Sequence, residues 1–214
     1  MTPIKTALDY GLRDYLDEGP SGRRQTIDVA AALFRERGFA AVSMNEIASA
    51  VGLSKPGLYH HWPSKDTILH VIAQLSGEIL LNHLDVVERS GFAPSQTLHH
   101  YVISRLEAVT QHQDLFTVTW QERAILGTRT FEGLARMAED YRRRVRALID
   151  TAKSEGAIKP DVDSHLLMLA LDGMTGWAYF WYRPSGDFDI REISDAFWAM
   201  LGMGVLMPDG ANQP

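Results

Sequence analysis

Hydrophobic positions recur at the spacing of an α-helix along nearly the whole chain. Between residues 21 and 37, for example, Ile27, Ala30, Ala31 and Phe34 fall on one face. This is the i, i+3, i+4, i+7 pattern of an amphipathic helix. No stretch alternates apolar and polar residues with the period of two that is typical of a strand. The pattern therefore predicts an all-α protein with about nine helices.

Capping residues and helix breakers give the expected limits of these helices. Ser43 and Glu46 have the S-x-x-E form of a capping box. Ser54 and Pro56 suit the N-cap and first turn of the next helix, and Gly52 suits the left-handed backbone of the turn between the two. The predicted helices cover residues 21–37, 43–51, 55–61, 64–88, 95–111, 113–126, 130–155, 164–182 and 190–206.

The two short helices at 43–51 and 55–61, supported by the helix at 21–37, form the pattern of a helix-turn-helix. In this motif the second helix enters the major groove of DNA while the first braces it against the backbone. Helical hairpins with other functions share the same spacing. A more specific signal is therefore needed before a function is assigned.

That signal is the continuous segment at residues 38–69, GFAAVSMNEIASAVGLSKPGLYHHWPSKDTIL. It resembles the signature of the TetR family of bacterial regulators, which combines I-A-x-x-x-G-hydrophobic-S, G-x-hydrophobic-Y-x-[HY]-[FW] and [PS]-S-K-[DE]. The resemblance extends from Arg23 to Leu69. It implies a transcriptional regulator, a repressor that binds a palindromic operator as a homodimer and responds to a ligand.

The resemblance also implies how the chain is divided. An N-terminal extension is expected at 1–20 and a three-helix DNA-binding domain with the helix-turn-helix at 21–66. A larger helical domain for ligand binding and dimerisation is expected at 67–208. The boundary falls inside the long helix that begins near Ser64, so the two domains are expected to share that helix.

Roles in DNA binding follow position by position from the resemblance. Lys55 and His60 are expected to read base edges, and Gly57 to allow close approach of the backbone to the groove. Tyr59 and Lys65 are expected to contact phosphates. The full set of expected DNA-binding residues is Arg23, Arg24, Ser43, Ser54, Lys55, Gly57, Tyr59, His60 and Lys65. Without the motif, the lysines would be ordinary solvent-exposed residues and Tyr59 a half-buried core residue.

The charge distribution is compatible with this interpretation. The formal net charge is −6, which by itself argues against nucleic acid. Residues 21–65, however, carry six basic and three acidic side chains, so the excess of acid lies elsewhere. A mildly basic module on an acidic body can approach phosphates locally.

The two last predicted helices are suited to dimerisation. Gly173 and Gly176 lie three residues apart and would permit close helix approach, and the alternative is an internal core without a dimer. The apolar residues available to such an interface are Leu166, Leu169, Trp177, Phe197, Trp198, Met200 and Met203.

The middle helices carry large apolar side chains with a few polar groups, as a small-molecule pocket requires. An ordinary helical core has the same composition. Arg142, Arg143, Arg144 and Arg146 form either a solvated face or a site for an anionic head group. The expected ligand-binding residues are Phe116, Trp120, Arg123, Met137, Tyr141, Met168 and Trp177.

A short C-terminal string indicates a class of effector. Residues 181–186, WYRPSG, with Ile193 and Gly202, resemble the TetR subgroup that senses acyl-CoA thioesters in lipid or steroid catabolism. The resemblance implies a small hydrophobic or CoA-thioester ligand as the effector.

Other classes of protein find little support in the sequence. There is no cysteine, no Gly-x-Ser-x-Gly elbow, no P-loop, no Rossmann fingerprint and no cluster with metal-ligand spacing. We therefore expect no enzyme, no metal and no cofactor. The N-terminus lacks the apolar run of a signal peptide and no segment is long enough to span a bilayer, so a cytoplasmic location is expected. The alternative function is a helical acyl-CoA-binding protein without an operator.

Overall fold

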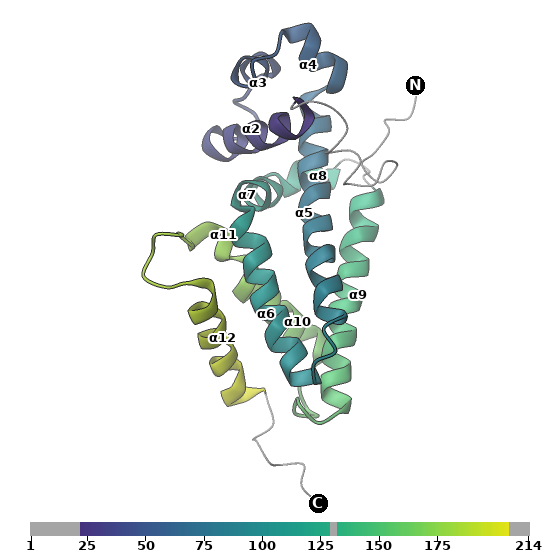
Figure 1. Ribbon diagram of the computed structural model, residues 1–214. Helices are drawn as coiled ribbons and strands as arrows, with labels where there is room; N and C mark the ends of the chain where they lie inside the picture. The colour runs from purple at the N-terminus through teal and green to yellow at the C-terminus, as the bar shows by residue number, and fades with distance from the viewer. Residues whose placement is uncertain (1–21, 129–131, 206–214) are drawn as a thin grey trace, which may run out of the picture. The chain divides into compact units, whose positions relative to one another are not determined.

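The computed structural model describes residues 22–128 and 132–205, and all elements in these ranges are α-helices, which confirms the predicted fold class (Figure 1). The predicted extension at 1–20 lies outside the described residues. The helices are α2 (Gly22–Arg37), α3 (Met44–Ala50), α4 (Lys55–His61), α5 (Lys65–Glu88), α6 (Pro94–Gln111), α7 (Gln113–Gln121), α8 (Arg123–Thr128), α9 (Glu132–Ser154), α10 (Ser164–Gly176), α11 (Ala178–Trp181) and α12 (Ile190–Gly204).

Most predicted helix limits agree with the structure to within two residues, but two predicted helices are wrong because each is interrupted. The helix expected at 113–126 is divided at Glu122 into α7 and α8. The Glu122 carboxylate accepts a hydrogen bond from the backbone N–H of Phe39 at 3.3 Å, a tertiary contact that periodicity does not reveal. The helix expected at 164–182 is divided at Trp177 into α10 and α11.

Packing divides the chain into two compact units. Unit 1 comprises the chain up to Glu78 together with residues 112–134, and unit 2 comprises residues 79–111 and the chain from Ala135 onward. The helix α5 runs through both units. The sequence likewise predicted that the long helix beginning near Ser64 is shared by two domains. The division at residue 66 into a DNA-binding and a ligand-binding domain stays a prediction.

In unit 1, α2 packs against α3 and α7, and α3 packs against α4. The fully buried side chains of Phe34, Ile47, Leu58 and Trp62 join these helices in one hydrophobic core. Burial of large apolar side chains is the main stabilising contribution in such a small bundle. This core therefore fixes the short helices α3 and α4, which are too short to be stable in isolation.

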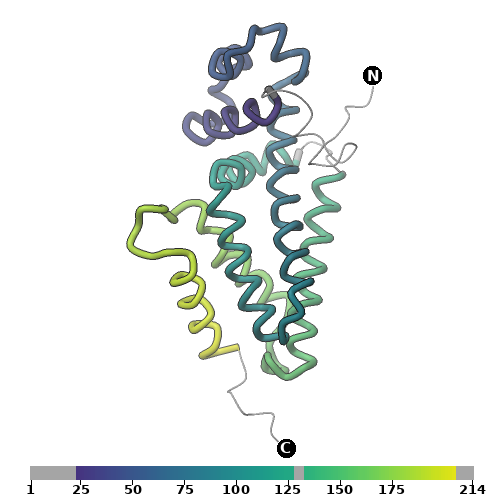
Figure 2. Tube along the Cα trace, viewed as in Figure 1, coloured from purple at the N-terminus to yellow at the C-terminus, as the bar shows by residue number. Residues whose placement is uncertain are grey.

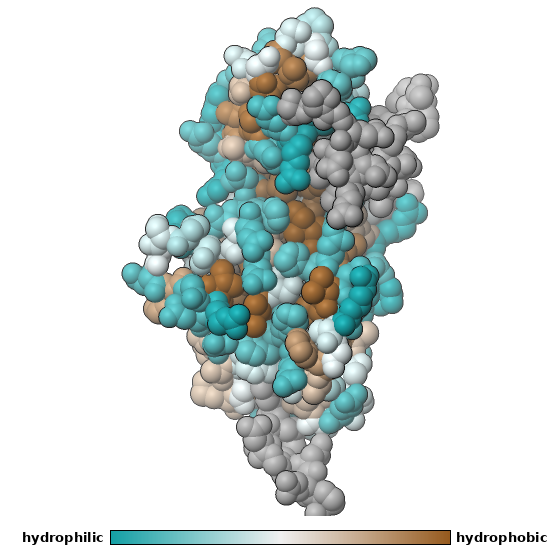
Figure 3. Space-filling model, viewed as in Figure 1, coloured by the Kyte–Doolittle hydropathy of each residue, from teal (hydrophilic) through white to brown (hydrophobic). Residues whose placement is uncertain are grey.

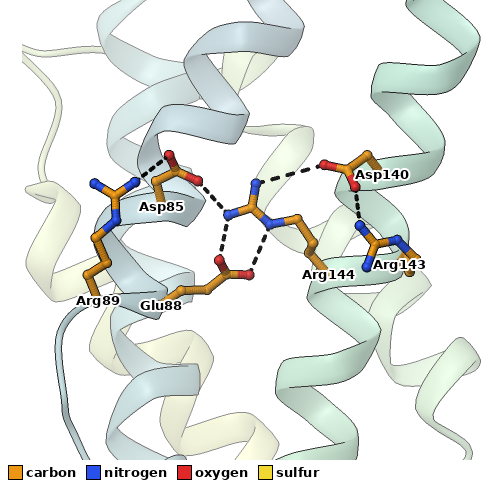
Figure 4. A network of polar contacts seen from close by, with 6 residues as sticks. All are labelled: Asp85, Glu88, Arg89, Asp140, Arg143 and Arg144. Atoms are coloured by element: carbon orange, nitrogen blue, oxygen red, sulfur yellow. Dashed lines mark hydrogen bonds and ion pairs between the residues drawn. The ribbon is translucent and has the colours of Figure 1, made fainter.

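In unit 2, α6 packs against α10, α11 and α12, and the trace in Figure 2 shows α12 running beside α6. The second half of α5 is joined to α9 by an ionic network (Figure 4). Its central residue, Arg144, donates hydrogen bonds to Asp85 at 2.5 Å and to both carboxylate oxygens of Glu88 at 2.5 and 3.0 Å. Arg143 pairs with Asp140 on the same helix. The arginine run at 142–144 is thus engaged by neighbouring carboxylates.

A second polar cluster lies deeper in unit 2. The guanidinium of Arg105 donates to the Tyr141 hydroxyl at 2.8 Å and to Thr175 at 2.9 Å, and it pairs with Asp172 at 3.2 Å. The hydroxyls of Tyr101 and Tyr141 lie 3.1 Å apart. Burial raises the pKa of both tyrosines, so both phenols stay protonated and can donate. The cluster connects α6, α9 and α10.

The surface shown in Figure 3 is mainly hydrophilic, with hydrophobic side chains in separate patches. Within the described ranges no helix is both long enough and apolar enough to cross a membrane. The same ranges contain no group of three or more metal-ligating side chains.

Candidate nucleic-acid interface

The entry to α3 has the capping box that the sequence predicts. The backbone N–H of Glu46 donates to the Ser43 hydroxyl oxygen at 3.3 Å, and the backbone N–H of Ser43 donates to the Glu46 carboxylate at 2.8 Å. Arg37 contacts the other oxygen of this carboxylate at 2.6 Å. Hydrogen bonds from Ser43, with the contribution of Arg37, lower the pKa of Glu46 to about 2. The start of α3 is therefore held by satisfied polar groups at the surface.

The turn after α3 is built on Gly52, which has a φ of 71°. Left-handed backbone of this kind favours glycine because it lacks a Cβ. The N–H of Leu53 bonds back to the Ala48 carbonyl at 2.9 Å, which closes the end of α3. Ser54 then caps α4 by accepting a hydrogen bond from the Gly57 N–H at 3.2 Å. The turn and cap together fix where α4 begins.

The helix α4 has one buried side and one exposed side. Leu58 and the adjoining Trp62 are 0% exposed, so they anchor the helix in unit 1. Lys55, Tyr59 and His60 are exposed, Tyr59 to 43%. The side chains expected to contact DNA from this helix are thus at the surface and not packed in the core.

Gly57 lies close to the cap of the same helix. A Cβ at this position would lie 3.2 Å from the Ser54 hydroxyl oxygen, which is the atom that caps α4. A larger residue would therefore crowd the N-cap of α4, and a role of Gly57 in approaching a groove is an additional expectation.

Lys65 has a more specific environment than the sequence suggests. Its ammonium donates to the carbonyl oxygens of Phe39 and Val42 at 2.5 and 2.6 Å and lies 4.3 Å from the centre of the Phe39 ring. These carbonyls belong to the segment that leads from α2 into Ser43. In this structure the amine therefore ties the first turn of α5 to the entry of α3, and its contact with phosphate stays a prediction.

The remaining expected contacts lie at the start of α2. Arg24 is exposed and forms a 3.6 Å ion pair with Asp28 one turn later. Arg23 is half-buried, and its charge acts on His61 at the end of α4. Burial, with the charges of Arg23 and His60, lowers the pKa of His61. Unit 1 thus brings Arg23 near α4, although the two lie far apart in the sequence.

Comparison with known proteins identifies this arrangement. Residues 27–72 match the family model described as "Bacterial regulatory proteins, tetR family", and residues 91–205, more than half of the chain, match the model "Tetracyclin repressor-like, C-terminal domain". The chain belongs to the TetR family. The family assignment from residues 38–69 is thereby confirmed, and the chain is a transcriptional regulator of this family.

Relatives of this TetR-family chain cover almost its whole length. The HTH-type transcriptional repressor KstR2 of Rhodococcus jostii (strain RHA1) is 26% identical over 192 residues, which are 89% of this chain and 94% of the relative. KstR2 of Mycobacterium tuberculosis (strain ATCC 25618 / H37Rv) is 24% identical over 187 residues, which are 86% and 93% of the two chains.

Solved structures show the same fold. The structure of the ketosteroid transcriptional regulator KstR2 of Mycobacterium tuberculosis matches with a TM-score of 0.80 at 23% identity, covering 89% of this chain and 98% of that one. The regulator AibR, crystallised with isovaleryl coenzyme A and operator DNA, matches with a TM-score of 0.73 at 27% identity, covering 83% and 96%.

The residues expected to bind a ligand are spread over both units of this TetR-family protein. In unit 1, Phe116 is half-buried, and Arg123 lies over the Trp120 ring at 4.8 Å on the surface. In unit 2, Met137, Tyr141 and Met168 are buried, whereas Trp177 is 47% exposed. The Tyr141 hydroxyl is engaged by Arg105. These seven residues therefore do not form one cluster within either unit, and their role stays a prediction.

The expected role of Gly173 and Gly176 in close helix approach across the dimer stays a prediction. A Cβ at Gly176 would lie 3.3 Å from a terminal nitrogen of Arg105, so this glycine also makes room for the buried guanidinium. A Cβ at Gly173 would meet nothing within 4 Å. Large apolar side chains are nevertheless exposed on α10 and α12, namely Leu166, Leu169, Met200 and Met203.

The sequence interpretation missed two groups of polar residues. One is the Arg105 cluster, whose members come from three helices and have no common spacing. The other is a stripe on α5 formed by His70, Gln74 and Glu78, which lie at i, i+4 and i+8 of that helix. Polar residues at this spacing on a buried helix face were a detectable signal.

Proposed function

We propose that this protein is a cytoplasmic, ligand-responsive repressor that binds a near-palindromic operator as a homodimer. The proposal rests on the geometry of α4 in a chain of the TetR family: one face of this helix is exposed, and the opposite side is held in the core by the buried Leu58. Lys55, Tyr59 and His60 are the residues we expect at the DNA. In the dimer, two such helices would occupy successive major grooves ~34 Å apart.

The dimer is proposed to form through α10 and α12. Leu166 and Met203 are 65% and 81% exposed, and soluble monomers seldom expose many large apolar side chains on neighbouring helices. A two-fold axis places the same patch of both copies face to face, so one surface suffices for a closed dimer. The symmetry of the dimer would then match that of the operator.

The effector is proposed to be a small hydrophobic molecule or a CoA thioester. The relative AibR was crystallised with isovaleryl coenzyme A and operator DNA, and the relative KstR2 is a ketosteroid transcriptional regulator. A ligand releases the operator if it binds more tightly to the conformation that fits DNA poorly. The expected ligand-binding residues Phe116, Trp120, Met137 and Met168 remain part of this proposal.

The test is a mobility shift with DNA upstream of the protein's own gene, repeated with acyl-CoAs. Tyr59→Phe should weaken binding to every sequence, since it removes a phosphate contact. His60→Ala should change base preference at one operator position, by about 1–3 kcal/mol. Arg142→Ala, an exposed arginine on α9, is the control. Equal losses for Tyr59→Phe and His60→Ala, or none, would contradict the assigned roles.

Salt dependence separates this function from the two alternatives. Operator binding should weaken steeply as salt rises, because phosphate contacts release counterions. An acyl-CoA-binding protein without an operator, or a helical enzyme, would show no specific shift at any salt concentration. The relatives are transcriptional regulators, which favours the repressor, and we infer that the chain has no enzymatic activity.

A further inference from the structure

Unit 1 buries polar atoms that have no hydrogen-bond partner among the residues described. Gln74 on α5 is 1% exposed, yet neither its amide nitrogen nor its amide oxygen is bonded. The hydroxyl of Thr117 on α7 and one carboxyl oxygen of Glu78 are likewise buried and unbonded. All three residues belong to unit 1. Native proteins satisfy nearly all such groups, so three in one small unit require an explanation.

A structural role does not explain them. An unbonded buried amide destabilises the folded state, whereas an apolar side chain of the same size in its place would not. The neighbouring Ser76 shows the usual solution, since its hydroxyl bonds to the Ile72 carbonyl and to Thr119 on α7 at 3.0 Å each. The polar atoms of Gln74 therefore retain hydrogen-bonding capacity that no described residue uses.

The chemistry of the stripe is that of an uncharged surface. Gln74 offers an N–H donor and a carbonyl acceptor. Burial lowers the pKa of His70 and raises the pKa of Glu78, and each shift favours the neutral form of its group. The flanking positions Val71, Leu75 and Ile72 are buried and apolar. A small molecule that complements this surface has an apolar body and an uncharged oxygen-containing group, such as a carbonyl or a hydroxyl.

We propose that Gln74, with Glu78 one turn later on α5, forms the polar recognition element of the effector site and binds a carbonyl or hydroxyl oxygen on a largely apolar small molecule. This inference rests on the proposed function as a ligand-responsive repressor. The amide N–H of Gln74 donates to a ligand carbonyl, and its oxygen accepts from a ligand hydroxyl. A charged head group, if the effector carries one, binds elsewhere.

The position of Gln74 also provides a route to the DNA-binding helices. Lys65 and Gln74 lie on the same helix, nine residues or ~14 Å apart, and both belong to unit 1. Lys65 holds the carbonyls of Phe39 and Val42 beside the start of α3. A ligand that moves α5 at Gln74 therefore moves the helix turn that holds the entry of α3.

The deciding variant is Gln74→Met, which keeps the length of the side chain and removes its polar atoms. Gln121→Met makes the same change at an exposed position of α7 and is the matched control. The probes are 5α-androstane-3,17-dione, the corresponding diol and the parent hydrocarbon 5α-androstane, delivered in cyclodextrin. The readouts are melting temperature, ligand affinity and operator binding.

We expect the wild type to bind the dione or the diol at least tenfold more tightly than the hydrocarbon. Without ligand, Gln74→Met should raise the melting temperature by ~2–4 °C. Its affinity for the oxygenated probes should fall at least tenfold. Gln121→Met should change none of these. A lower melting temperature for Gln74→Met, unchanged affinity for the probes, or equal binding of the hydrocarbon would overturn the proposal.

Two further outcomes separate this inference from the proposed function. If the wild type binds its operator but no oxygenated probe binds, the inference fails and the repressor function stands. If the wild type binds no operator while Gln74→Met still loses probe affinity, the repressor function fails and the binding site stands. The lipophilic cation rhodamine 6G tests for an ionic site. If the wild type binds it tightly and Glu78→Gln does not, the site recognises charge and the neutral-ligand proposal is overturned.

Discussion

The two units of this protein bury polar side chains in opposite ways. In unit 2, Arg105 is nearly inaccessible, but each of its bonded partners, Tyr141, Thr175 and Asp172, lies within 3.2 Å. In unit 1, Gln74 is at least as deeply buried and has no bonded partner among the residues described. Burial alone therefore does not indicate what a polar residue does. Satisfied groups rigidify a core, and unsatisfied groups keep their capacity for a ligand.

The largest effect in this comparison is expected for Arg105→Met. The substitution removes the donor that Tyr141, Thr175 and Asp172 share, and breaking a buried pair on one side is strongly destabilising. Asp172 is partly exposed, so we expect a loss of about 3 kcal/mol in the free energy of unfolding, near the low end for such pairs. Chemical denaturation measures it, with Arg142→Met as the exposed control. A loss as small as that of the control would mean that the cluster does not stabilise unit 2.

Arg144→Leu should destabilise the protein less, although Arg144 has more carboxylate partners. Its partners Asp85 and Glu88 are about one-third exposed, so solvent screens the interaction. We expect about 1 kcal/mol at low salt, decreasing as salt rises. Denaturation at two salt concentrations tests this. An effect that is independent of salt would indicate a packing role for the side chain in place of an electrostatic one.

Lys65→Met should show whether this residue acts in the fold, at the DNA, or in both. Removing the ammonium leaves the carbonyls of Phe39 and Val42 without their donor, which should cost about 1 kcal/mol in stability. Operator affinity should fall as well. Lys65→Arg keeps a cation with different geometry and serves as the comparison. Lower operator affinity with unchanged stability would assign Lys65 to phosphate contact alone.

The smallest effect is expected for Glu46→Gln and depends on pH. The folded protein lowers the pKa of Glu46 from 4.5 to about 2, so its charge stabilises the native state at pH above 4.5. This contribution is lost as the pH falls from 4.5 towards 2. The melting temperatures of wild type and variant should therefore differ slightly at pH 7 and converge progressively as the pH falls from 4.5 towards 2. A constant difference would show that the charge of Glu46 is not involved.

Much of the fold and of the DNA-binding module follows from the sequence. The capping box at Ser43, the turn at Gly52 and the N-cap at Ser54 are local signals, because the interacting groups lie within a few residues of one another. The limits of α4 were predicted at both ends. Breaks at Glu122 and Trp177 were not predicted, since the periodicity of apolar residues continues across them.

The sequence by itself thus determined the all-helical fold, the family and the face of α4, since each depends on contacts between near neighbours or on a continuous motif. Only the tertiary structure decided which polar residues are satisfied. Arg105 and Asp172 are 67 positions apart in the chain, and their pairing depends on how α6 and α10 pack. Whether a buried amide such as Gln74 has a partner is likewise a property of the assembled core. Hydrogen bonding between distant helices has no period in the sequence, so it cannot be derived from spacing.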